Sequence, residues 1–149
     1  RAAAGRLEAD VRIPADVWSG TSYNELRREG LEVERWNQLH PDDEPRKSYL
    51  DTALAGRSGP FVAATDYMKI VPDQIQRWIP GTFISLGTDG FGRSDSRKAL
   101  REFFEVDRRY IVVTTLKALA DEGALDQSTV AEAIEKYGID PDRPDPVTL

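Results

Sequence analysis

Short apolar runs alternate with stretches of helical periodicity along this chain. Residues 60–64 and 82–86 form compact, mostly apolar runs followed by turn residues, which indicates two buried strands. Residues 15–19 are a third strand candidate. Helical segments separate these runs, and parallel strands need such crossovers. The pattern therefore predicts an α/β domain with three αβα layers and a small, mainly parallel sheet.

Capping residues and helix breakers set the expected helix boundaries. Ser22 and Glu25 have the spacing of a capping box, in which a hydroxyl and a carboxylate satisfy the first free amides. The helix that follows is expected to end near His40, because Pro41 cannot continue it. Further helices are expected over residues 47–55, from a cap at Ser94 or Asp95 to Glu105, from Asp107 to Gly123, and from Asp126 to Gly138. Residues 67–78 are also a helix candidate, in which 67–71 form an irregular lead-in and Pro72 marks the true first turn.

Three strand candidates are few for a parallel sheet. The chain also starts without Met, in an Ala-rich stretch that resembles the end of a helix. We therefore expect residues 1–149 to form a single, truncated domain from which a first strand before Arg1 is missing. The prolines and aspartates of residues 140–146 predict an exposed tail over residues 140–149.

Composition narrows the class of protein. The 149 residues carry a net charge of −6, with 26 acidic and 20 basic side chains, and such a surface is unsuited to nucleic acid. There is no Cys, which excludes a disulfide framework, a thiolate zinc site and a cysteine nucleophile within these residues. No apolar stretch approaches the roughly 18 residues needed to span a bilayer. We expect a cytoplasmic protein that binds neither nucleic acid nor membrane.

The stretch L-G-T-D-G-F-G-R-S-D-S-R at residues 86–97 carries the most information about function. A strand, a Gly-rich loop and a helix start follow one another. Free amides at a helix start can bind an anion, here with help from Arg93. The glycine spacing is neither that of a dinucleotide fingerprint nor that of a P-loop. The alternative is a tight strand-to-helix turn in which Gly90 takes a positive φ.

Asp66 and Asp89 each follow a predicted strand, and ligands of α/β sheets bind at the carboxyl ends of strands. Either the pair serves a ligand, or both are loop aspartates that bond backbone amides or a neighbouring subunit. With the Gly-rich loop they define one candidate site, a ligand-binding or dimer-contact loop made of Asp66, Asp89, Gly90, Arg93 and Ser94.

Two further side-chain types raise the question of catalysis. His40 is the only histidine and could act as a general acid or base, but its position after a helix end favours capping of free carbonyls. No other metal ligand lies near it at a suitable spacing. Ser19 and Ser22 lack the G-x-S-x-G turn of a serine nucleophile, and helix capping explains such hydroxyls.

Four stretches of the sequence resemble one known family. Over about residues 6–146 the chain is similar to the carboxy-terminal domain of the homodimeric-type bacterial pyruvate dehydrogenase component, within the transketolase-like, thiamine-diphosphate-dependent superfamily. The Gly-rich stretch is highly specific to this family, and its looser form G-x-D-x-F-G-x-S is similar to transketolase. The stretches are V-W-S-G-T-S-Y at 17–23, E-R-W-N-Q-L-H-P at 34–41, A-T-D-Y-M-K at 64–69 and L-G-T-D-G-F-G-R-S-D-S-R at 86–97.

The resemblance implies a homodimeric enzyme that oxidatively decarboxylates pyruvate and passes the acetyl group to a lipoyl-bearing acyltransferase. It implies that thiamine diphosphate and Mg²⁺ are bound by other domains, and that this chain holds no catalytic, cofactor-binding or metal-binding residue. Alone, the chain would be inactive, and its role would be scaffolding and dimer packing against the second subunit. The family's domain begins with a strand and a G-S-G turn that this sequence lacks.

Two other functions stay open. The chain could belong to another transketolase-like enzyme, which the shared loop alone does not exclude, although residues 36–41 argue against transketolase itself. It could instead be a stand-alone regulatory module that binds an anion such as phosphate through residues 87–96.

Overall fold

The structure is a computed structural model that describes residues 1–149. Helices and strands alternate in the order that an α/β domain requires. The elements are α1 Ala2–Val11, α2 Tyr23–Leu39, α3 Tyr49–Ala53, β1 Phe61–Ala64, α4 Ile70–Asp73, the 3₁₀ helix η1 Gln76–Trp78, β2 Phe83–Leu86, α5 Arg97–Phe103, α6 Arg108–Asp121, α7 Gln127–Lys136 and the 3₁₀ helix η2 Pro146–Thr148.

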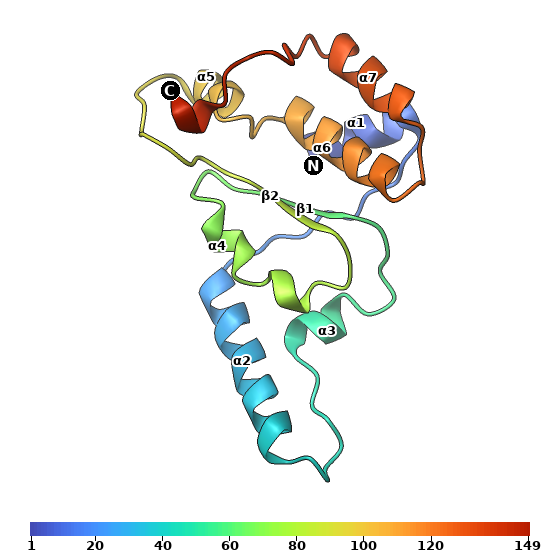
Figure 1. The fold of residues 1–149 in the computed structure, drawn as a ribbon, viewed down its shortest axis with the longest axis vertical. Helices are drawn as coiled ribbons and strands as arrows, with labels where there is room; N and C mark the ends of the chain where they lie inside the picture. The colour runs from blue at the N-terminus through green and yellow to red at the C-terminus, as the bar shows by residue number, and fades with distance from the viewer.

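The sheet consists of two parallel strands. β1 pairs with β2 in a register that sets Phe61 opposite Phe83 and Ala64 opposite Leu86. Helices lie on both sides of the strands, with α1, α6 and α7 on one side and α2, α3 and α4 on the other (Figure 1). The predicted α/β class, with helical layers around a small parallel sheet, is confirmed.

The prediction of a third strand at residues 15–19 is wrong. This segment is exposed, has no regular secondary structure and pairs with no strand. An extended segment forms a strand only where a neighbour satisfies its backbone groups, and no strand lies beside it. The two observed strands are also less buried than predicted, because their residues are half-buried or, at Ala64, exposed.

Most helix boundaries agree with those predicted. The hydroxyl of Ser22 accepts from the amide of Glu25 at the start of α2, although the reciprocal bond of a capping box is absent. The helix ends at Leu39, with His40 at its C-cap. The carboxylate of Asp107 caps α6 as predicted.

Two helix predictions are wrong in detail. α5 is capped by Ser96 and not by Ser94 or Asp95. The segment 67–78 does not form one helix. Pro72 lies in the first turn of α4, as expected, but α4 ends at Asp73. The bonds that follow reach only three residues back, so residues 76–78 form the 3₁₀ helix η1.

Two apolar clusters pack the helices. The larger joins α1, α6 and α7, and Val112 and Leu116 at its centre are fully buried. The smaller joins α3 to the segment that carries α4 and η1, and consists of Leu50, Leu54, Ile75 and Trp78. The clusters contain different residues, so each holds the helices of one layer together.

Residues 140–149 are mostly exposed but are attached to the domain at two points. Arg143 donates to the carbonyls of Glu102 and Phe103 over 3.3 and 3.4 Å. Pro146 is buried at the start of η2. The segment therefore packs against the end of α5.

Candidate functional site

The predicted aspartates fix the loops at the carboxyl ends of the strands. Asp66 follows β1 and accepts two bonds of 3.0 Å from the guanidinium of Arg101 in α5, and Arg97 lies 3.7 Å away. Asp89 follows β2, and its Oδ1 accepts from the backbone amide of Lys69 over 3.0 Å. Asp66 thus joins its loop to α5, whereas Asp89 joins the two strand ends to each other.

A glycine directly after β2 lets these two loops approach closely. A Cβ on Gly87 would lie 2.5 Å from the carbonyl oxygen of Tyr67, which is too close for any side chain. The amide of Thr88 donates to the same carbonyl over 2.9 Å. A glycine at a strand end is a known signal of close backbone approach, but the sequence does not say which segment approaches.

The Gly-rich loop contacts the segment at residues 145–149. Gly90 has φ 94°, and a Cβ there would lie 3.2 Å from the Cα of Val147. Arg93 donates to the carbonyl of Leu149 over 3.3 Å, and its guanidinium lies 4.2 Å from the ring centre of Phe103. The loop is therefore held by residues far from it in the sequence.

The structure brings together only part of the predicted site. Asp89, Gly90 and Arg93 bond or contact neighbouring backbone segments, whereas Asp66 pairs with α5 and Ser94 is exposed. The positive φ of Gly90 agrees with the tight-turn interpretation of this loop.

Large apolar side chains are exposed on the same loops. Tyr67, Met68 and Ile70 follow β1 with exposed fractions of 60%, 48% and 62%, and Phe91 in the Gly-rich loop is 83% exposed. The two segments that carry these side chains touch through the bond from the Thr88 amide to the Tyr67 carbonyl, and exposed apolar side chains on adjacent segments are typical of a contact surface. They were not predicted, because residues 67–71 were interpreted as an irregular lead-in to a helix and Phe91 as part of a Gly-rich turn, and neither interpretation says which side chains are exposed.

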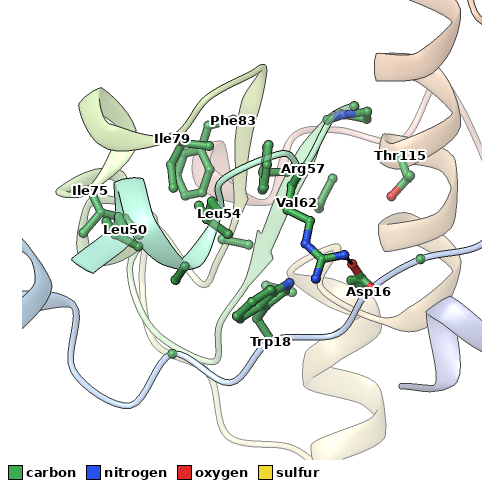
Figure 2. Close-up of a pocket in the computed structure, with 18 of the residues that line it drawn as sticks. Asp16, Trp18, Leu50, Leu54, Arg57, Val62, Ile75, Ile79, Phe83 and Thr115 are labelled. Atoms are coloured by element: carbon green, nitrogen blue, oxygen red, sulfur yellow. Dashed lines mark hydrogen bonds and ion pairs between the residues drawn. The ribbon is translucent and has the colours of Figure 1, made fainter. Parts of the chain in front are cut away.

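A groove of about 860 Å³ lies beside β1 (Figure 2). Its walls come from β1, from the extended segment at residues 13–20, and from α3 and α6. Leu54 and Val62 line it on one side and Thr115 on the other, with Trp18 at the rim. The lining is mainly apolar, so the groove suits an apolar occupant.

An ion pair lines this groove. Arg57 donates to Asp16 over 2.7 Å, and its guanidinium lies 5.9 Å from the ring centre of Trp18. All three side chains come from segments without regular structure, so sequence periodicity does not reveal them.

The edge of β1 opposite β2 has backbone groups without a strand partner. Alternate residues of a parallel strand direct their backbone groups to the same neighbour. The amides of Phe61 and Thr65 donate toward the β2 segment over 2.7 and 3.0 Å. Those of Val62 and Ala64 consequently point to the other edge, where the sheet has no further strand.

His40 has a structural role at the end of α2. Its Nδ1 donates to the carbonyl of Trp36 over 2.8 Å, which satisfies a free carbonyl of the last turn. The imidazole stacks on the Trp36 ring at 4.2 Å between centres, and the guanidinium of Arg46 lies 3.8 Å from the Trp36 ring centre. The capping interpretation of His40 therefore holds.

Neither a metal centre nor a membrane span is visible. No three side chains of the His, Cys, Asp and Glu types lie close enough to hold a metal ion. None of the helices combines the length and the apolar character that crossing a bilayer requires.

Comparison with known proteins finds relatives that match almost the whole chain. The chain is 58% identical over 146 residues to the pyruvate dehydrogenase E1 component of Pseudomonas aeruginosa. This match covers 97% of the chain and 17% of that protein. It is 47% identical over 147 residues to the pyruvate dehydrogenase E1 component of Escherichia coli, or 98% of the chain and 16% of that protein. The chain thus spans less than a fifth of these relatives.

A family match covers most of the chain. Residues 1–107 match the family described as the transketolase-like TK C-terminal domain. This span includes both strands, the whole Gly-rich loop and the walls of the groove beside β1 other than that from α6. The chain therefore belongs to the transketolase-like TK C-terminal domain family.

Proposed function

We propose that this chain is the carboxy-terminal domain of a cytoplasmic pyruvate dehydrogenase E1 component and that it holds no catalytic residue. The observation that carries the proposal is the 58% identity to the Pseudomonas aeruginosa E1 component over 97% of the chain. The whole enzyme decarboxylates pyruvate oxidatively and passes the acetyl group to a lipoyl-bearing acyltransferase.

Thiamine diphosphate and Mg²⁺ belong, on this proposal, to other parts of the enzyme. The residues of this chain do not fit them, because no three side chains of the His, Cys, Asp and Glu types lie close enough to hold Mg²⁺, and the Gly-rich loop has neither a dinucleotide fingerprint nor a P-loop spacing. Asp66 and Asp89 are engaged by Arg101 and by the Lys69 amide. When bound, the cofactor supplies the electron sink for decarboxylation, and the protein supplies binding and orientation.

The physical role of this domain is contact with the second subunit of the homodimer. Tyr67, Met68, Ile70 and Phe91 form the contact surface, and the Gly-rich loop presents Phe91 at its tip. Asp66 joins the segment after β1, which carries three of these side chains, to α5. Exposed apolar area of this kind is stabilised by burial at an interface.

The same proposal explains the short sheet. A strand from the polypeptide that precedes Arg1 in the whole enzyme occupies the groove and pairs with the outer edge of β1. Two observations support it. The amides of Val62 and Ala64 point to an edge of β1 where no strand accepts from them, and the groove at that edge has mainly apolar walls. Such a strand is buried on both faces and should read as a continuous apolar run.

Activity measurements test whether this chain belongs to a pyruvate dehydrogenase and is inactive by itself. The full-length enzyme should oxidise pyruvate in the presence of thiamine diphosphate, Mg²⁺ and the lipoyl acyltransferase, whereas the 149-residue chain alone should not. Turnover by the isolated chain, or a full-length protein that does not act on pyruvate, would refute the proposal.

Amide hydrogen exchange with residue-level fragmentation tests the strand. In the full-length enzyme, the amides of Val62 and Ala64 should exchange as slowly as that of Ala63, because all three would be hydrogen-bonded. Exchange of Val62 and Ala64 at the rate of open loop amides would show that the edge is free. The amide of Glu44, which is exposed in a loop outside the proposed contact surface and donates no hydrogen bond, serves as the reference for an open site.

A further inference from the structure

A second cleft, separate from the groove beside β1, lies where four segments meet at the carboxyl end of β2. Its volume is about 360 Å³. The walls come from the start of α4, from the loop after β2, from the junction between α5 and α6, and from residues 139–147. The carboxyl end of a parallel strand is the position at which α/β folds bind small ligands.

Two of its charged side chains, of opposite sign, lack a partner. The ammonium of Lys69 and the carboxylate of Glu105 both line the cleft, both residues are half-buried, and neither forms an ion pair or a side-chain hydrogen bond. The other charged groups of the cleft are engaged elsewhere. Asp89 accepts from the Lys69 amide, Arg143 bonds the carbonyls that end α5, and the carboxylates of Asp140 and Asp145 each accept a backbone amide.

Glu105 occupies a backbone position that suits glycine. Its φ is 59°, and the bonds from Val106 to Arg101 and from Glu105 to Glu102 form the turn that commonly ends a helix with glycine. Gly123 and Gly138 hold this position after α6 and α7, with φ 76° and 61°. Arg12, the other non-glycine residue with positive φ, is exposed, whereas Glu105 lines the cleft. A strained residue that faces a cleft is a reason to look for a ligand.

The pKa of Glu105 is raised, as expected for a half-buried carboxylate without a hydrogen-bond partner. Burial raises the pKa of Glu105, Arg143 lowers it, Asp145 raises it further, and Lys69 lowers it. Lys69 and Arg143 therefore act on the carboxylate through space, since neither forms an ion pair with it, and all three residues line the cleft.

We propose that this cleft binds a small zwitterion of the amino-acid class, with the ligand's ammonium on Glu105 and its carboxylate on Lys69. The two unpartnered groups match the two charges of such a molecule, and Leu86, Phe104 and Ile139 line the cleft for an apolar side chain. The inference does not rest on the proposed pyruvate chemistry, because the test measures binding and not turnover.

Calorimetric titration of the full-length enzyme with leucine tests the proposal. Two analogues each lack one charge: 4-methylpentanoate has no ammonium, and 3-methylbutylamine has no carboxylate. Leucine should bind saturably, and each analogue should bind about tenfold more weakly or worse, since a charge-assisted hydrogen bond is lost. The absence of saturable leucine binding in the millimolar range, or equal binding of the three compounds, overturns the proposal.

Variants locate the site. Lys69→Gln and Glu105→Gln should each weaken leucine binding by about tenfold, while Lys98→Gln and Glu132→Gln, which change exposed charges on α5 and α7, should leave it unchanged. Leucine binding that persists in both cleft variants places the ligand elsewhere and refutes this site. Thermal unfolding of the same proteins verifies that every variant is folded.

Discussion

The indole ring of Trp78 lies directly on the backbone of Gly30. A Cβ at Gly30 would sit 2.5 Å from a ring atom of Trp78, and Gly30 is the only buried residue of α2. This contact attaches α2 to the small apolar cluster. Glycine has a low helix propensity and weakens α2, but only glycine leaves room for the Trp78 ring at this position.

The first prediction concerns this contact. Gly30→Ala should destabilise the domain by about 1–3 kcal/mol, because the added methyl group must displace the Trp78 ring. Gly5→Ala is the matched control: Gly5 lies in α1 with nothing within 4 Å of an added Cβ, and Ala should stabilise that helix by up to about 1 kcal/mol. Urea denaturation measures both, and equal effects of the two substitutions would contradict the packing argument.

The second prediction concerns the proposed subunit contact. Ile70→Asp or Phe91→Asp should weaken the homodimer of the full-length enzyme, because an unpaired charge would be buried at the interface. Leu39→Asp changes a residue of similar exposure to Ile70, 55% against 62%, at the end of α2. Sedimentation measures the dimer constant. A dimer as strong in the Ile70 and Phe91 variants as in the Leu39 variant argues against this surface.

The third prediction concerns the Gly-rich loop. Gly90→Ala places a methyl group 3.2 Å from the Cα of Val147 at a positive φ, whereas Gly123→Ala has a positive φ but open space. Both should lose about 1–2 kcal/mol through the left-handed backbone. Only Gly90→Ala should also speed amide exchange in residues 145–149. Unchanged exchange there would show that the loop and this segment are independent.

The fourth prediction concerns acid stability. The hydroxyl of Tyr137 donates to Asp10 over 2.6 Å and Lys136 lies 2.9 Å from the same carboxylate, which lowers the pKa of Asp10 below 3.8. Because the folded-state pKa is depressed, this stabilisation is complete above pH 3.8 and is lost as the pH falls through the folded value.

Tyr137→Phe tests this linkage, because it removes the hydrogen bond and leaves the ring in the core. Between about pH 2 and 5 the free energy of unfolding should depend less steeply on pH in the variant than in the parent protein. Parallel curves for the two proteins would show that this bond does not set the pKa of Asp10.

The fifth prediction concerns the strain at Glu105. Glu105→Gly should raise the melting temperature, because it relieves the positive φ and removes a half-buried carboxylate without a partner. Arg12→Gly, the control, relieves a similar φ at an exposed position. A larger gain at Glu105 than at Arg12 is expected, and a loss would mean that the carboxylate stabilises the fold.

Much of the fold could be predicted from the sequence because its signals are local. Ser22, Asp107 and Gly138 mark helix ends through bonds to residues at most five positions away. The failures have non-local causes. Residues 15–19 have the composition of a strand, but no strand lies beside them. Ser94, Asp95 and Ser96 can each cap a helix, and the sequence does not show that Ser96 is the cap of α5.

The candidate site shows the same division. Asp66 and Asp89 were singled out because they follow strands, and the structure gives both of them bonds. Their partners lie 35 and 20 residues away, so the sequence does not reveal them. Glu105 and Lys69 were missed entirely, because nothing in their local sequence distinguishes a cleft residue from an exposed charge.

The sequence by itself determined the alternation of strands and helices, the helix caps and the family, since each depends on residue type and on spacing along the chain. Only the tertiary structure decided which loops touch, which edge of β1 is open and which charges remain unpaired. Those features arise from distances between segments remote in the chain, and such distances are set when the two apolar clusters pack and not by any local preference.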